Sequence, residues 1–125
     1  MKKAPVMKKA LVVVLLLGLV LFAATRCGGM NNDTPMDAAK VLIQACIDGD
    51  AKLMSKINHS SPLAYPPQFL LERASEYKLY KYKMSDFTFT PAGDDAVVVT
   101  NKKAGLNWKC VFVKEKDGWY FSEIK

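Results

Sequence analysis

The sequence has little histidine and little cysteine, and it lacks the short motifs in which these residues usually carry out chemistry. Its 125 residues include one histidine, His59, and three cysteines. A zinc site, a serine–histidine–aspartate triad and a CxxC redox pair each need more of these residues, or a closer spacing, than the chain provides. Glycine-rich phosphate loops and paired catalytic carboxylates at diagnostic spacing are also missing. We therefore predict no metal and no cofactor, and we expect His59 to lie in a loop.

Positive charge is also scarce once the N-terminal segment is set aside. The whole chain carries a net charge of +6, but four lysines and Arg26 lie within residues 1–29. The remaining 13 basic residues are matched by 12 acidic ones, which leaves a net charge of +1 for the rest of the chain. Proteins that bind nucleic acid usually present a clustered basic face, so we predict no nucleic-acid partner. We expect Lys78, Lys81 and Lys83, which alternate with tyrosines, to form the solvated face of a strand.

Residues 1–29 have the order of parts that an export signal has. Four lysines precede an uncharged apolar run over residues 10–25, and two glycines close the segment. A helix of that run would span only about 24 Å, which is less than the ~30 Å hydrocarbon core of a membrane. We therefore predict a signal peptide, and cleavage is favoured over a permanent membrane span.

Cys27 lies where bacterial lipoproteins carry their lipid-modified cysteine, and residues 21–29 resemble a lipobox followed by a flexible tether. The resemblance implies that Cys27 is lipidated and that the protein is held at the extracytoplasmic face of a membrane of the bacterial cell envelope. Arg26 departs from the pattern, because lipoprotein signal peptidases read Gly, Ala or Ser at that position. Two alternatives stay open: a cut after Gly29 that gives a soluble secreted or periplasmic protein, and an uncleaved anchor.

Residues 35–125 are predicted to form a single α+β domain, preceded by a polar tether over residues 30–34. The length of this part suits one modest hydrophobic core. Its first helix has Thr34 as N-cap and Pro35 at the first helical position, and Gly49 ends it in a left-handed conformation. Apolar residues recur at helical spacing between these ends and form one stripe that faces the core.

Two more helices and a sheet are predicted to follow. Asp50 caps a second, short helix, and a third helix covers residues 67–77, after a loop with three prolines. From Tyr80 onward the periodicity changes to two. The alternation predicts four strands joined by short turns, an antiparallel meander whose first strand has a β-bulge at Ser85 and Asp86. We expect the helices to cover one face of this sheet, since neither layer can bury its apolar surface alone.

Two runs of the domain carry a resemblance to known proteins. Residues 35–50 read as a proline, alanines and a terminal Gly-Asp, and residues 111–120 end a hairpin in Asp-Gly-Trp-Tyr. Both are similar to small bacterial lipoproteins whose fold is like that of nuclear transport factor two or the cystatins. The resemblance implies a curved sheet, shaped like a cone, whose mouth holds a small apolar ligand or an active site. Such proteins include isomerases and dehydratases as well as binding modules without chemistry.

On this basis we expect an extracytoplasmic, non-catalytic binding or interaction module, with an envelope protein or a small apolar ligand as partner. The alternative is a small enzyme that uses a carboxylate in the cone. Asp86 is the carboxylate suited to act as general base, with Tyr80 or Tyr82 as hydrogen-bond donor. A carboxylate at a strand irregularity usually points to water, so the non-catalytic function is favoured.

Cys46 and Cys110 remain as an even pair when Cys27 is assigned to lipid. An envelope protein folds in an oxidising compartment, where disulfides form. Both residues lie on apolar registers, one on the helical stripe and one on a strand. A disulfide between them would contribute about 4 kcal/mol in the chain-entropy account. The alternative is two separate buried thiols that pack as small hydrophobic residues.

Overall fold

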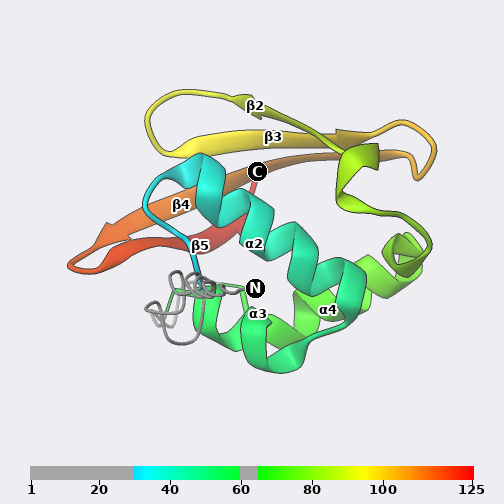
Figure 1. Cartoon of the computed structure of the whole chain (residues 1–125), viewed down its shortest axis with the longest axis horizontal. Coiled ribbons are helices and arrows are strands. Elements are labelled where there is room, and N and C mark those ends of the chain that lie inside the picture. The colour runs from blue at the N-terminus through cyan, green and yellow to red at the C-terminus, as the bar shows by residue number, and fades with distance from the viewer. Residues whose placement is uncertain (1–29, 60–64) are drawn as a thin grey trace, which may run out of the picture. The chain divides into compact units, whose positions relative to one another are not determined.

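The computed structural model describes residues 30–59 and 65–125, and Asn32–Lys125 is one compact unit. Three α-helices come first and an antiparallel sheet follows, which confirms the predicted α+β class (Figure 1). The predicted signal peptide and its Cys27 lie outside the described residues. Within the described ranges, no helix has the length and apolarity needed to cross a membrane. The elements are α2 (Pro35–Asp48), α3 (Ala51–Ile57), α4 (Pro67–Glu76), β2 (Thr88–Pro91), β3 (Ala96–Asn101), β4 (Leu106–Glu115) and β5 (Gly118–Ile124).

Helix α2 begins and ends where the sequence predicts. The side chain of Thr34 accepts a hydrogen bond from the backbone N–H of Asp37 at 3.1 Å, and Pro35 occupies the first turn, where a missing N–H costs nothing. Gly49 has φ = 64°, and its N–H donates to the carbonyl of Ala45. These local signals set the two ends of the helix.

The two shorter helices also follow their predictions. Asp50 caps α3 by accepting a hydrogen bond from the N–H of Leu53 at 3.0 Å. Helix α4 starts at Pro67 as predicted and ends at Glu76, with Tyr77 as its C-cap. Both helices pack on α2 and on each other, and α3 also contacts β5.

The sheet is a four-stranded antiparallel meander in the order β2-β3-β4-β5, as predicted. Helix α2 contacts all four strands and covers one face, as Figure 1 shows. Inward-facing residues of β4 alternate with exposed ones, so Trp108, Cys110 and Phe112 face the helices. A register shift between Val111 and Phe112 bends the pairing of β4 with β5.

The first predicted strand is wrong over its first half. The chain forms two short 3₁₀ turns, η3 (Leu79–Lys81) and η4 (Met84–Asp86), and β2 begins only at Thr88. Lys78 adopts a left-handed conformation with φ = 56°, which turns the chain sharply after α4. Leu79 is fully buried, although alternation with the tyrosines would have put it on the solvated face with the lysines. The lysines therefore lie on turns, and no strand with a bulge at Ser85 and Asp86 forms.

Aromatic and aliphatic side chains fill the space between α2 and the sheet. Phe112 and Phe121 are 1% and 0% exposed, and their rings meet edge to face with centroids 6.0 Å apart. Trp108 is 5% exposed and packs edge to face against Tyr77 at 5.7 Å. Each such side chain contributes about 1.5–3 kcal/mol when fully buried. The domain's own aromatic residues thus occupy its interior.

Asn32, which the sequence places in the tether, is tied to the sheet. It is 6% exposed, and its side-chain amide donates to the carbonyl of Trp119 at 3.0 Å. Its own carbonyl accepts from the N–H of Trp119 at 2.9 Å. A Cβ on Gly118 would come within 2.6 Å of the Asn32 amide nitrogen, so only glycine permits this approach.

Candidate functional site

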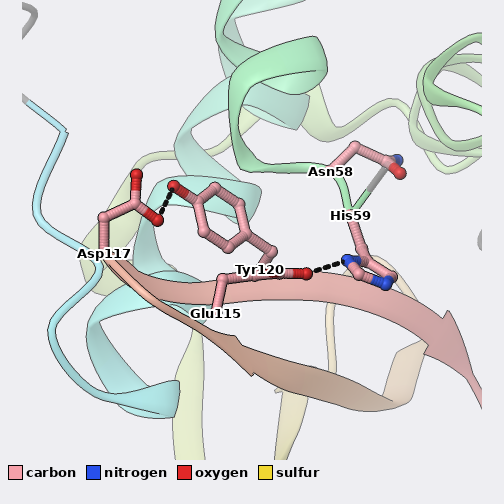
Figure 2. A pocket seen from close by; sticks show the side chains of 5 residues that line it. All are labelled: Asn58, His59, Glu115, Asp117 and Tyr120. Carbon is pink, nitrogen blue, oxygen red and sulfur yellow. Dashed lines mark hydrogen bonds and ion pairs between the residues drawn. The ribbon is translucent and has the colours of Figure 1, made fainter. Parts of the chain in front are cut away.

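A cleft of about 220 Å³ opens beside the turn between β4 and β5, and we call it the hairpin cleft (Figure 2). Its five lining residues combine an imidazole, two carboxylates, a phenol and an amide. They come from two places in the chain, the end of α3 and the β4–β5 hairpin. These residues are Asn58, His59, Glu115, Asp117 and Tyr120.

Backbone hydrogen bonds position His59 against the outer edge of β5. Asn58 is the C-cap of α3, and its side-chain amide donates to the carbonyl of Tyr65 at 2.8 Å. The N–H of His59 donates to the carbonyl of Phe121 at 2.8 Å, and Asn58 forms a parallel bridge with Phe121. The segment thus adds to the sheet edge and places the imidazole over the hairpin.

His59 faces Glu115 across the cleft. Its Nδ1 lies 2.7 Å from Oε2 of Glu115, and Figure 2 shows the carboxylate extending toward the ring. Nδ1 is buried, and the oxygen lies outside the direction in which a ring N–H donates. The contact is therefore an ion pair when the imidazole is protonated, rather than a hydrogen bond of ordinary geometry. The side chains are 20% and 42% exposed, so solvent screens this attraction.

Tyr120 and Asp117 form the second pair of the cleft. The Tyr120 hydroxyl donates to Oδ1 of Asp117 at 3.0 Å. Burial raises the pKa of Tyr120, and the hydrogen bond to Asp117 raises it further, while Asn32 acts in the opposite direction. The phenol is therefore protonated at neutral pH and serves as a hydrogen-bond donor.

Two polar groups of the cleft are each held by a carboxylate. The imidazole and the phenol each lie against a carboxylate, which holds both in place. The phenol keeps its proton, so it is not an activated nucleophile. Within residues 30–59 and 65–125, no group of three or more His, Cys, Asp or Glu side chains is arranged to hold a metal ion.

Asp86, the predicted general base, lies elsewhere and has a structural role. Its Oδ2 accepts a hydrogen bond from the backbone N–H of Lys83 at 3.0 Å, which closes the turn η4. Asp86 lines a separate pocket near the start of β2, and the described lining of that pocket does not include the predicted donors Tyr80 and Tyr82. Tyr80 is 61% exposed, and the ring of Tyr82 packs against Phe87. The described lining of that pocket thus contains the predicted base without either of the alternative donors.

Cys46 and Cys110 are both buried and carry free thiols in the structure. Burial raises the pKa of the Cys46 thiol to about 12. The pKa of Cys110 is raised further, by burial first and then by the neighbouring Cys46. The predicted disulfide between them stays a prediction, and both thiols are protonated and shielded at neutral pH.

Sequence reasoning missed the pairing of His59 with Glu115. The sequence predicted His59 in a loop without a partner, because His59 and Glu115 are far apart in the chain. The backbone hydrogen bond from His59 to Phe121 of β5 brings the two side chains together. Comparison with protein families finds no family model that matches this chain. Comparisons with curated proteins and with solved structures find no match either.

Proposed function

We propose that this chain is a non-catalytic binding module of the bacterial cell envelope, held at a membrane by its N-terminal segment, which contacts a partner protein through the hairpin cleft. The partner would meet an acidic and aromatic surface that offers the carboxylates of Glu115 and Asp117 beside the ring of Tyr120. Such a surface suits hydrogen-bond donors and basic side chains of another protein.

The filled interior is the observation that carries this proposal. A module that binds a small apolar ligand needs a concave apolar cavity, and the cone implied by the resemblance would supply one. Here Phe112, Phe121 and Trp108 lie between the sheet and α2 and are almost fully buried. The remaining place for recognition is the surface, which favours a partner protein over a small apolar ligand.

The hairpin cleft is preferred as the contact surface because its side chains are already held in place. Tyr120 donates to Asp117, and Glu115 lies against His59. Asn32 fixes the base of the hairpin through two hydrogen bonds to Trp119. Groups that are fixed before binding lose little conformational entropy when a partner docks.

The proposal for location rests on the predicted signal peptide and on Cys27. Intact-mass measurement of the protein purified from membranes tests it. Lipidation at Cys27 adds the mass of a diacylglyceryl group to a chain that begins at that residue. A mass equal to the full unmodified chain would contradict both cleavage and lipidation and leave the uncleaved anchor.

Site-specific photocrosslinking in intact cells tests the binding function. The photoreactive amino acid p-benzoylphenylalanine replaces Tyr120 in one variant and Tyr80 in a control. Tyr80 is 61% exposed and lies outside the cleft, so both positions accept a bulky aromatic group at the surface. We expect a discrete crosslinked envelope protein from position 120 and none from position 80. Equal crosslinking from both positions, or none from position 120, would contradict the proposal.

The alternative of a small enzyme has less support. Its predicted base, Asp86, accepts a hydrogen bond from the backbone of Lys83 and closes a turn. Replacing Asp86 with Asn preserves an acceptor for that bond and removes the base. A loss of cellular function in this variant, with normal folding and normal crosslinking at position 120, would favour the enzyme.

A further inference from the structure

A second pocket lies at the other end of the sheet, and we call it the turn pocket. Its volume is about 280 Å³. It lies where β2 begins, where β3 ends and where the turn to β4 follows. Its residues are two lysines, two threonines, one asparagine and one aspartate, namely Asp86, Thr88, Thr100, Asn101, Lys102 and Lys103.

Asn101 has a buried donor without an acceptor. The residue is 3% exposed, and its Nδ2 has no hydrogen-bond partner. Its Oδ1 accepts a hydrogen bond from the N–H of Ala104 at 3.1 Å. Exchanging the amide oxygen and nitrogen would break that bond and place Nδ2, a donor, against the N–H of Ala104. Buried donors of this kind are rare in native proteins and are normally satisfied by a water or a bound group.

Hydrogen-bond donors dominate the surroundings of Asn101. Thr88 and Thr100 lie directly opposite one another in the register of β2 and β3, and each carries a hydroxyl. Lys102 and Lys103 are exposed and add two ammonium groups. The single carboxylate of the pocket, Asp86, already accepts from the N–H of Lys83. The two ammonium groups outnumber the one carboxylate, so the pocket carries net positive charge.

We propose that the turn pocket binds a phosphate group. A tetrahedral oxyanion offers several acceptor oxygens in different directions, which suits donors that come from β2, from β3 and from the turn. Lysine is a common phosphate ligand, and a hydrogen bond to a charged acceptor is stronger than one between neutral groups. The volume exceeds that of phosphate alone and leaves room for a small attached group. This site is separate from the hairpin cleft and does not depend on it.

The test uses the full chain in micelles of a nonionic detergent and measures binding by isothermal titration calorimetry at constant ionic strength. Three ligands are compared: inorganic phosphate, glycerol 3-phosphate and dihexanoyl phosphatidylglycerol. Saturable binding of the first two indicates a free phosphate compound. Saturable binding of the lipid alone indicates a phospholipid headgroup. Both results support the phosphate site, and no saturable binding in any arm overturns it.

Variants separate the pocket from general charge attraction. We expect K102A/K103A to weaken binding about tenfold or more, since two charge-assisted contacts are lost. The control K52A/K56A removes the same charge from exposed positions on α3 and should change binding less than about twofold. Asn101→Asp keeps the acceptor for Ala104 but replaces the donor with a carboxylate, and it should abolish binding. Circular dichroism checks its folding, and if it misfolds the lysine variants decide. Equal weakening by both lysine pairs would show an adventitious ion only and overturn the site.

Discussion

The two ends of strand β4 carry opposite kinds of polar site. At the end of β4 the hairpin cleft holds an imidazole and a phenol, each against a carboxylate. At its beginning the turn pocket holds two lysines and a buried amide donor without an acceptor. A strand of ten residues separates them by about 30 Å.

The difference concerns how far the polar side chains of each site interact with one another, and it indicates which kind of ligand each site suits. In the hairpin cleft the Tyr120 hydroxyl donates to Asp117, and His59 lies 2.7 Å from Glu115, so each group faces an oppositely disposed group within the site. In the turn pocket two lysines accompany one carboxylate, which already accepts a hydrogen bond from Lys83, so positive charge is left over for a bound anion. We therefore propose a partner protein for one end and a phosphate group for the other.

The largest expected effect comes from adding one methyl group at the hairpin. A Cβ on Gly118, which has φ = 150°, would lie 2.6 Å from Nδ2 of Asn32. We expect Gly118→Ala to lower the free energy of unfolding by about 3 kcal/mol or more, through overlap and backbone strain together. Urea denaturation followed by circular dichroism measures it.

Gly105 supplies the matched control at the other end. It lies in the turn beside the turn pocket with φ = 72°, and a Cβ there would meet nothing within 4 Å. Gly105→Ala should cost only the strain of a left-handed alanine, about 1–2 kcal/mol. An equal or larger loss from Gly105→Ala would contradict the claim that Asn32 locks the hairpin.

The stability of the protein at alkaline pH tests the burial of two thiols, that of Cys110 in the middle of β4 and that of Cys46 on α2. The pKa of Cys46 is raised to about 12 and that of Cys110 is raised further, both by burial, from a usual value of 9.0. The folded state therefore keeps protons that the unfolded state releases, and this stability is lost as the pH rises above about 9. With a reductant present, we expect about 3 kcal/mol of stability to be lost between pH 8 and pH 10, because each of the two thiols loses about 1.4 kcal/mol over this whole range, which is centred on their usual pKa.

The same experiment decides the predicted disulfide. If Cys46 and Cys110 are joined, no thiol titrates, and the alkaline loss should appear only after reduction. Titration of thiols in denatured, unreduced protein gives an independent count. Two free thiols from the domain, with the same alkaline loss in both conditions, would rule the disulfide out. A reduced protein that is equally stable at pH 8 and pH 10 would contradict the burial of the thiols.

Removing the carboxylate of the turn pocket should strengthen the binding of phosphate there. Asp86→Asn keeps an acceptor for the N–H of Lys83 but removes a negative charge beside the anion. We expect phosphate to bind about threefold more tightly, the size of a partly exposed charge interaction. Asp94→Asn, at an exposed turn residue that does not line the pocket, is the control and should leave the affinity unchanged. Weaker binding in Asp86→Asn would contradict a phosphate ligand.

The smallest expected effect concerns the contact between His59 and Glu115. These side chains are 20% and 42% exposed, so their attraction is screened. His59→Gln and Glu115→Gln should each change the free energy of unfolding by less than about 1 kcal/mol, with a coupling of about 0.2–1 kcal/mol in a double-mutant cycle at pH 6. High salt should reduce the coupling. A coupling above about 2 kcal/mol would mean that the pair is structural and not a screened surface contact.

Local chemistry made much of the fold predictable from sequence. Thr34, Asp50 and Gly49 act within one turn of the chain, and each caps its helix as expected. The alternation that begins in β3 also gave the correct meander. The segment after Tyr77 was mispredicted because alternating tyrosines and lysines satisfy a period of two, whereas the left-handed Lys78 and the buried Leu79 interrupt a strand there.

The sites were much harder to predict than the fold. Both depend on contacts between segments that are far apart in the sequence, such as His59 with Glu115 in the hairpin cleft. The unused donor of Asn101 is likewise visible only when its surroundings are known. Asp86 was predicted to lie at a β-bulge, and it instead closes a 3₁₀ turn by accepting a hydrogen bond from the N–H of Lys83.

One titration tests the contrast between the two ends most directly. The full-length protein, labelled with ¹⁵N in detergent micelles, is titrated with phosphate while the side-chain amide signals of Asn101, Asn58 and Asn32 are followed. We predict a saturable shift of the Asn101 signal, because Asn101 lines the turn pocket, and no shift of Asn58 or Asn32, whose amides lie outside it and donate to carbonyls. An unmoved Asn101 signal, or equal shifts at all three residues, would contradict the account.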